Sequence, residues 1–225
     1  MTQVGRAPRD GGSREGVPPD VPWSRVTFRL LTGLLGLAAV VTEIATLVER
    51  GTFVAANFFS YFTILTNVLV GVTMLVAALL TAAGRLETLD VVRGAAAVYA
   101  LVVGIGFAVL LSGLEDVAFT AVPWDNVVLH YLVPAAVLVD LVLDPPRRRL
   151  RFVPSLGWLA FPLAYLAYSL VRGEITGWYP YPFLDPATDG VGGIALTTLA
   201  LLVLGAVLTL GACRLSGGRG PGRTG

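Results

Sequence analysis

Six long apolar runs constrain this chain more than any other feature of its sequence. The runs cover residues 26–48, 58–80, 94–112, 126–143, 152–171 and 191–212. About 20 apolar residues are enough for a helix to cross the roughly 30 Å hydrocarbon core of a bilayer. Within the runs the apolar residues are continuous and do not alternate with a period of two, which favours helices over barrel strands. The sequence therefore predicts an all-α, polytopic membrane protein with six transmembrane helices.

Composition excludes a lone soluble domain. Of the 225 residues, 55% are hydrophobic and 14% are charged, whereas a soluble domain has about 25% charged residues. Six spans and two polar ends leave no room for a soluble domain in the connections. We expect one transmembrane domain at 26–213, between tails at 1–25 and 214–225 that are rich in Gly and Arg and are predicted to be disordered.

The distribution of arginine predicts the orientation of the spans, because cytoplasmic connections of membrane proteins carry an excess of basic residues. One side of a six-span arrangement carries Arg6, Arg9, Arg14, Arg25, Arg85, Arg93, Arg147, Arg148, Arg149, Arg151, Arg214, Arg219 and Arg223. The other side carries only Arg50 and Arg172. The pattern predicts a cell-membrane protein with both termini in the cytoplasm and with 49–57, 113–125 and 172–190 as outer loops.

Several functional classes lack the residues that they need. The net charge of +1 gives no reason to expect a nucleic-acid partner, so the expected partners are membrane lipids. A single cysteine, Cys213, and a single histidine exclude an internal disulfide and a zinc motif of the H-E-x-x-H type. The G-x-S-x-G, P-loop and dinucleotide motifs are also missing from the sequence. We therefore expect neither a metal nor a cofactor.

The second run opens with a polar stripe. On a continuous helix, Asn57, Ser60, Thr63 and Asn67 fall within about 120° of one another. Such a stripe must face protein or water. One interpretation is that it joins packed helices, since such hydrogen bonds are worth about 0.6–2 kcal/mol each in membranes. Asn67 is expected to have a structural or orienting role in either case, because a buried amide needs partners.

The fourth run contains the only histidine, His130, four residues before Pro134. An imidazole is suited to moving protons near neutral pH, although a lone histidine in a span is also a common hydrogen-bonded core residue. Asp140 lies further along the same run. We expect its side chain to extend toward the arginines that follow Pro146 rather than to join a site.

The predicted threading brings the remaining polar residues to one depth. Glu43 lies near the outer end of the first run. Its carboxylate has three alternative roles: to orient an imidazole, to accept a proton or to reach the interface. The outer loop at 172–185 contains Trp178 and Tyr181 and is otherwise typical of an interfacial aromatic belt. Because Thr63, His130, Asn67, Glu43 and this loop all fall in the outer third of the bilayer, we expect one shared site.

At these residues the chain resembles the androgen-inducible integral membrane protein family, whose animal members are similar to threonine hydrolases that cleave fatty acid esters of hydroxy fatty acids. It resembles more closely a family of uncharacterised six-helix actinobacterial membrane proteins. The shared features are Tyr61-Phe62-Thr63, His130 shortly before Pro134, and the run from Gly177 to Leu184. Two features differ: Thr66 stands where an acidic residue is expected, and the His-to-Pro spacing is one residue shorter.

The resemblance implies that Thr63 is a nucleophile and His130 its catalytic histidine, in a lipid ester hydrolase with its site in the outer half of the bilayer. Asn67 is then a candidate for stabilising an oxyanion or for steering a water, and Glu43 for orienting the imidazole. Ser60, Trp178 and Tyr181 are expected to support the site or to bind its ligand. Two other classes remain open: a protein that binds or transports a small solute or protons, and a membrane subunit without catalytic activity.

Overall fold

The computed structural model describes residues 21–114 and 120–217, and over these ranges it contains helices and no strands. Six helical segments are long and apolar enough to cross a membrane: Trp23–Glu49, Phe62–Ala82, Leu86–Leu110, Pro123–Leu143, Phe152–Thr176 and Pro186–Leu215. The predicted all-α class with six such helices is therefore confirmed. The predicted tails fall largely outside the described residues, although the first helix begins at Trp23 and the last ends at Leu215.

The segments are built from shorter elements. In chain order these are α1 (Trp23–Glu49), α2 (Ala55–Phe58), α3 (Phe62–Ala82), η1 (Leu86–Leu89), α4 (Asp90–Leu110), α5 (Pro123–Val127), η2 (Val128–Leu132), α6 (Val133–Leu143), α7 (Phe152–Ser155), η3 (Leu156–Leu159), α8 (Ala160–Thr176), η4 (Pro182–Leu184) and α9 (Pro186–Leu215). η2 is a π-helix, whereas the other η elements are 3₁₀-helices.

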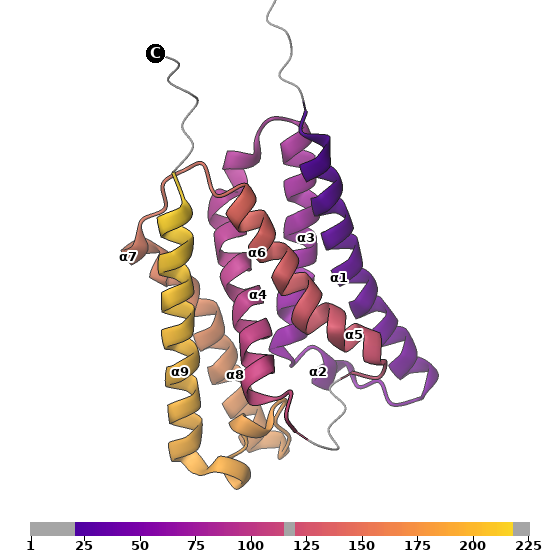
Figure 1. Ribbon diagram of the computed structural model, residues 1–225. Helices are drawn as coiled ribbons and strands as arrows, with labels where there is room; N and C mark the ends of the chain where they lie inside the picture. Colours follow the sequence, from indigo (N-terminus) through magenta and orange to yellow (C-terminus); the bar gives the residue numbers. More distant parts are fainter. Residues whose placement is uncertain (1–20, 115–119, 218–225) are drawn as a thin grey trace, which may run out of the picture.

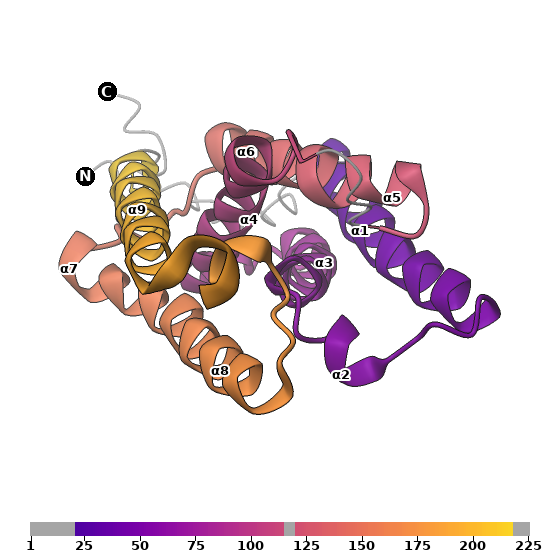
Figure 2. The same cartoon turned by 90° about the horizontal axis from the view of Figure 1, so that it is seen from below.

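The helices form one bundle with two distinct ends (Figure 1). α4 contacts α3, α6 and α9, while α1 packs on α3 and α6. Seen along the bundle, α3 lies between α1 on one side and the α8–α9 pair on the other (Figure 2). The start of α1, the end of α9 and the α3–α4 and α6–α7 connections lie at what we call the terminal end. α2, α5 and the α8–α9 connection lie at the opposite end.

Glycine allows α1 and α3 to pack closely. A Cβ atom added at Gly33 would lie 2.8 Å from the Gly71 carbonyl oxygen, and one added at Gly71 would lie 2.6 Å from the Leu37 side chain. Small residues at such crossings bring membrane helices together, because in lipid it is backbone and side-chain packing that drives their association. In the same helix pair, Thr81 of α3 accepts a hydrogen bond from Arg29 of α1.

The second predicted span is interrupted where the polar stripe begins. Tyr61 adopts an extended conformation, with φ −82° and ψ 125°, and serves as the N-cap of α3. Asn57 therefore lies on the separate helix α2, and Ser60 lies in the turn between the helices. The prediction of one continuous stripe from Asn57 to Asn67 was wrong. As a result, Thr63 lies in the first turn of α3, where main-chain N–H groups lack helical partners.

The fourth segment contains a π turn at its histidine. Pro134 has no N–H group, so it cannot donate to the carbonyl of His130 one turn earlier. The N–H of Val133 instead donates to the carbonyl of Val128, five residues back. Insertions of this kind are common at functional sites. The π turn gives the imidazole a direction that periodicity alone does not predict.

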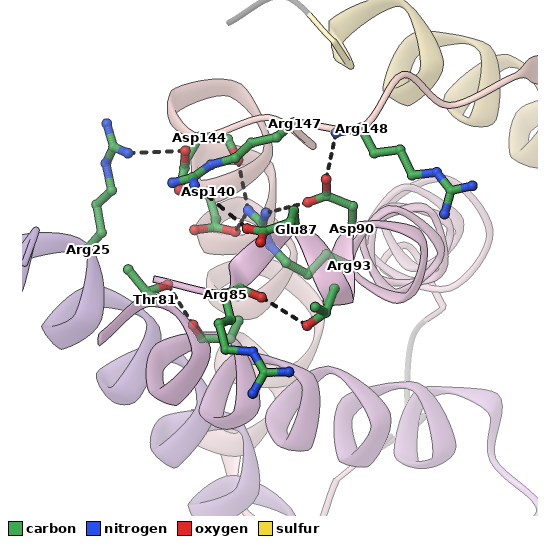
Figure 3. A network of polar contacts seen from close by, with 12 residues as sticks. Arg25, Thr81, Arg85, Glu87, Asp90, Arg93, Asp140, Asp144, Arg147 and Arg148 are labelled. Carbon is green, nitrogen blue, oxygen red and sulfur yellow. Dashed lines mark hydrogen bonds and ion pairs between the residues drawn. The ribbon is translucent and has the colours of Figure 1, made fainter. Parts of the chain in front are cut away.

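A buried ion network holds the terminal end together (Figure 3). Asp140 on α6 accepts from Arg29 of α1 at 2.7 Å and from Arg93 of α4 at 2.6 Å. Asp144 accepts from Arg29 at 2.8 Å and forms an ion pair with Arg25 at 3.1 Å. Because Arg29, Arg93 and Asp140 are buried, their charges depend on one another for compensation.

The network differs from the expectation for Asp140. Its hydrogen-bond partners are Arg29 and Arg93 rather than the arginines that follow Pro146. Of that arginine group, Arg148 reaches the network through its main-chain N–H, which donates to Asp90 at 2.7 Å (Figure 3). Asp140 is thus a structural centre inside the bundle.

Candidate functional site

The structure brings Thr63 and His130 together at the opposite end of the bundle. The Thr63 Oγ1 atom lies 3.4 Å from the His130 Nε2 atom, and both side chains are buried. The other ring nitrogen, Nδ1, lies 3.1 Å from the Asn126 carbonyl oxygen. A carbonyl only accepts hydrogen bonds, so Nδ1 carries the proton and the Nε2 lone pair faces the threonine hydroxyl. The pair has the arrangement of a hydroxyl and its base.

Tyr181 completes the contacts of Thr63. Its hydroxyl lies 3.2 Å from the Thr63 Oγ1 atom and 3.2 Å from the Thr63 main-chain nitrogen. The ring stacks on Phe183 and meets the Tyr61 ring edge to face. Burial raises the pKa of Tyr181 to about 12, so its phenol remains protonated at neutral pH.

Two cavities of different character meet at this point. The first, which we call the polar cavity, has a volume of about 430 Å³, and its lining includes Glu43, Arg50, Asn57, Tyr61, Thr63, His130, Trp178 and Tyr181. The second, the apolar cavity, has a volume of about 110 Å³, and its lining includes Thr63, Val103, Phe107, Leu166, Tyr181 and Leu202. Thr63 and Tyr181 line both cavities. The threonine hydroxyl therefore lies at the boundary between a polar and an apolar space.

Asn67 lies behind this pair and away from both cavities. Its Nδ2 atom donates to the Thr63 carbonyl at 2.9 Å and to the Leu129 carbonyl at 3.3 Å. Both amide hydrogens are used in these bonds, which leaves none for an oxyanion. Leu129 immediately precedes His130, so Asn67 joins the two helix segments that carry the hydroxyl and the imidazole. This position fits the predicted orienting role.

Glu43 lines the polar cavity but does not orient the imidazole. Its two carboxylate oxygens accept from the main-chain N–H of Ala121 at 2.8 and 2.9 Å, while the His130 Nδ1 atom faces Asn126. The Asp125 carboxyl also contacts Glu43. Glu43 therefore attaches α1 to the chain that leads into α5 and forms part of the wall of the polar cavity.

Ser60 lies outside the lining of both cavities, whereas Trp178 borders the polar cavity. The Ser60 hydroxyl lies 2.9 Å from the Tyr168 hydroxyl of α8, and its carbonyl accepts from Tyr165 at 2.9 Å. Ser60 therefore fixes the turn before α3. Trp178 lines the polar cavity, with the Arg172 guanidinium 4.7 Å from its ring centroid. This cation–π contact positions the aromatic loop at the cavity mouth.

Phe107 and Gly104 on α4 hold the imidazole from the other side. The Phe107 ring is stacked on that of His130, with centroids 3.9 Å apart and planes 23° from parallel. One turn earlier, a Cβ atom added at Gly104 would lie 2.9 Å from Pro134 and 3.1 Å from the His130 carbonyl oxygen. Both contacts fix the π turn against α4.

We predict that Gly104→Ala displaces His130. The added methyl group meets a proline ring and a main-chain carbonyl, neither of which can move freely, so overpacking of about 1–3 kcal/mol is expected. Thermal unfolding in detergent micelles should show the loss of stability. Gly106→Ala is the matched control, because its added Cβ meets nothing nearer than 3.6 Å. Equal unfolding temperatures for the two variants would contradict this account of the packing.

The sequence interpretation missed the specific roles of Phe107, Asn126 and the Tyr181 hydroxyl. An apolar aromatic residue and a backbone carbonyl carry no sequence signal of their own, whereas Tyr181 was visible only as part of an aromatic loop. Among the described residues no group of three or more His, Cys, Asp or Glu side chains is placed to hold a metal ion.

Chemically, the site combines a buried hydroxyl, an imidazole with a free lone pair and a protonated phenol at the junction of two cavities. Hydroxyl groups with an adjacent base are the usual nucleophiles of acyl transfer. Comparison of the chain with protein-family models, with curated proteins and with solved structures finds no match.

Proposed function

We propose that this chain is a multi-pass membrane hydrolase of lipid esters, with Thr63 as the nucleophile and His130 as the general base. The observation that carries the proposal is the position of the Thr63 hydroxyl, 3.4 Å from the His130 Nε2 atom and at the boundary of the polar and apolar cavities. Catalytic hydrogen bonds are often long before substrate binds and shorten in the reactive complex.

The reaction follows from the hydrogen-bond directions. Thr63 Oγ1 attacks the ester carbonyl carbon while its proton passes to the His130 Nε2 atom. The intermediate then expels the alcohol oxygen, which takes that proton and leaves Thr63 acylated. Water attacks the acyl-threonine by the same route, with His130 again accepting and then returning a proton. The products are a carboxylic acid and an alcohol.

The two cavities support a lipid ester as substrate. An ester that reacts at Thr63 has one side against the apolar cavity, where Val103, Leu166 and Leu202 line the wall. Its other side faces the polar cavity, which contains the side chains of Arg50 and Asn57. Leu163 lines the apolar cavity and is also 45% exposed on the outside of α8. This contact with the outer surface supports entry of an acyl chain from the bilayer.

Orientation is part of the proposal. The terminal end carries the arginine-rich connections, among them Arg85 and the run from Arg147 to Arg151. By the positive-inside rule this end faces the cytoplasm, so the Thr63 site lies in the outer half of the cell membrane. A cysteine introduced at an exposed outer position, Thr52 for example, should react with a membrane-impermeant maleimide in intact cells, whereas the native Cys213 should not.

Labelling with an alkyl fluorophosphonate tests the chemistry. The probe forms a bond from phosphorus to the attacking oxygen and loses fluoride, so it marks an activated hydroxyl. In purified protein we expect one adduct, located by mass spectrometry at Thr63. Thr63→Ala should abolish it, whereas Thr66→Ala, which alters a buried threonine of the same helix that lines neither cavity, should keep it.

The outcome separates the three functional classes. A carrier of small solutes or a purely structural subunit predicts no adduct at Thr63. Equal labelling of wild type and Thr63→Ala, or no labelling of either, would overturn the hydrolase proposal.

A further inference from the structure

The Tyr181 phenol touches both the hydroxyl and the main-chain nitrogen of Thr63, and this contact has no role in the reaction described above. The inference drawn from it rests on the proposed function. Tyr181 lies in the aromatic loop between α8 and α9, far in sequence from α3. Its side chain is buried against Tyr61 and Phe183, so its hydroxyl is held at Thr63 by packing on two sides.

The directions of the hydrogen bonds are fixed by the partners. The His130 Nδ1 atom donates to a carbonyl, which leaves the Nε2 atom as an acceptor for the Thr63 hydroxyl. With that proton committed, the contact between the Tyr181 and Thr63 hydroxyls is donated by the phenol. The phenol oxygen in turn accepts from the Thr63 main-chain N–H.

The Thr63 N–H is itself a donor without a helical partner. Thr63 is the second residue of α3, and the first N–H groups of a helix have no acceptor within it. These groups also stand at the positive end of the helix dipole. The acceptor that the structure provides is the Tyr181 oxygen at 3.2 Å. That oxygen accepts the hydrogen bond that this N–H could otherwise donate to a negatively charged oxygen beside the nucleophile.

We propose that the Tyr181 phenol and the Thr63 main-chain N–H together form the oxyanion hole of this site. When the Thr63 oxygen bonds to the ester carbon, the carbonyl π electrons move onto the carbonyl oxygen. That oxygen replaces the phenol oxygen as the acceptor of the N–H, and the phenol hydrogen turns from the Thr63 oxygen to it, so it accepts one hydrogen bond from each donor. No proton leaves the phenol, so it is unchanged when the intermediate collapses and the C=O bond re-forms.

The chemistry of the phenol suits this role. Its pKa of about 12 keeps it a neutral donor throughout the physiological range. The side-chain amide of Asn67 also lies near the nucleophile, but both of its hydrogens are donated to main-chain carbonyls, so it is not available as a donor to the oxyanion.

The test compares Tyr181→Phe with wild type in the hydrolysis of a long-chain 4-nitrophenyl ester and of its thionoester, in which sulfur replaces the carbonyl oxygen. Sulfur accepts hydrogen bonds weakly, so an enzyme with an oxyanion hole prefers the oxygen ester. We expect Tyr181→Phe to lower kcat for the oxygen ester by about 10²–10³-fold and to affect the thionoester far less. Tyr179→Phe is the matched control, because Tyr179 is a tyrosine of the same loop that lines neither cavity.

The outcomes separate this inference from the function on which it rests. Suppose that wild type is labelled at Thr63 and hydrolyses the ester. If the ratio of kcat for the oxygen ester to kcat for the thionoester is then the same in Tyr181→Phe as in wild type, the oxyanion role is overturned and the hydrolase proposal stands. A loss confined to esters of alkyl alcohols, with 4-nitrophenyl esters unaffected, would also overturn it, because that pattern identifies a donor to the leaving group. Wild type without Thr63 labelling or ester hydrolysis is instead the failure of the hydrolase proposal.

Discussion

Replacing His130 by alanine is expected to lower ester hydrolysis and fluorophosphonate labelling by about 10³-fold or more. General bases contribute about 10²–10⁴-fold, and a threonine hydroxyl is a poor nucleophile without one. His130 is the only imidazole in the chain, so no neighbouring histidine can replace it. Stopped-flow or continuous assays with a 4-nitrophenyl ester measure the loss in kcat.

Two controls separate a chemical role of His130 from a structural one. Added imidazole should partly restore activity in His130→Ala, because the site opens onto the polar cavity. Tyr131→Phe, which changes the next residue in the same π turn, should keep near wild-type activity. Full activity in His130→Ala, or a drop in Tyr131→Phe of the same size, is the result that contradicts the assignment.

The largest effect on stability is expected at Asp140. Asp140→Ala leaves Arg29 and Arg93 buried without the carboxylate that both of them contact. Removing one member of a buried ion pair costs about 3–5 kcal/mol, and for a chain of this size about 1 kcal/mol corresponds to 2–4 °C. We expect the unfolding temperature in detergent to fall by about 6–20 °C. If this variant fails to accumulate, Asp140→Asn, which keeps the shape and removes the charge, should give a smaller shift in the same direction.

Glu87→Ala is the control for charge at the same end of the bundle. Glu87 forms an ion pair with Arg147 at 3.8 Å, and both side chains are close to half exposed. Exposed pairs contribute about 0–1 kcal/mol, so the unfolding temperature should hardly change. A shift for Asp140→Ala no larger than that for Glu87→Ala would show that the ion network does not stabilise the bundle.

The sequence predicts which residues lie at the depth of the site, but it does not predict which groups they contact. Placing Thr63, His130 and the aromatic loop at one depth needed only the length of the spans, because a helix rises about 1.5 Å per residue. The roles of Asn67 and Glu43 depend on the hydrogen-bond partners of their side chains, which the sequence does not specify. The Glu43 carboxylate accepts from Ala121, a main-chain partner that no side-chain pattern reveals.

The break before α3 illustrates the same limit. Periodicity continued the second span back through Asn57, whereas an extended Tyr61 starts the helix at Phe62. The mainly aromatic stretch at 58–62 is compatible with either conformation. The packing of Tyr61 against Trp178 and Tyr181 favours the extended one, and these contacts come from a loop more than 100 residues away in the chain.

The amino-acid sequence by itself determined that this chain forms six membrane-length helices, because hydrophobic length is a local property that each run carries independently. Only the tertiary structure decided that Arg29 and Arg93 share Asp140 and that the Tyr181 phenol meets Thr63. Those contacts join residues 47 to 118 positions apart. They depend on helix rotation and on close glycine crossings, which are set by packing between helices rather than by the pattern within any one of them.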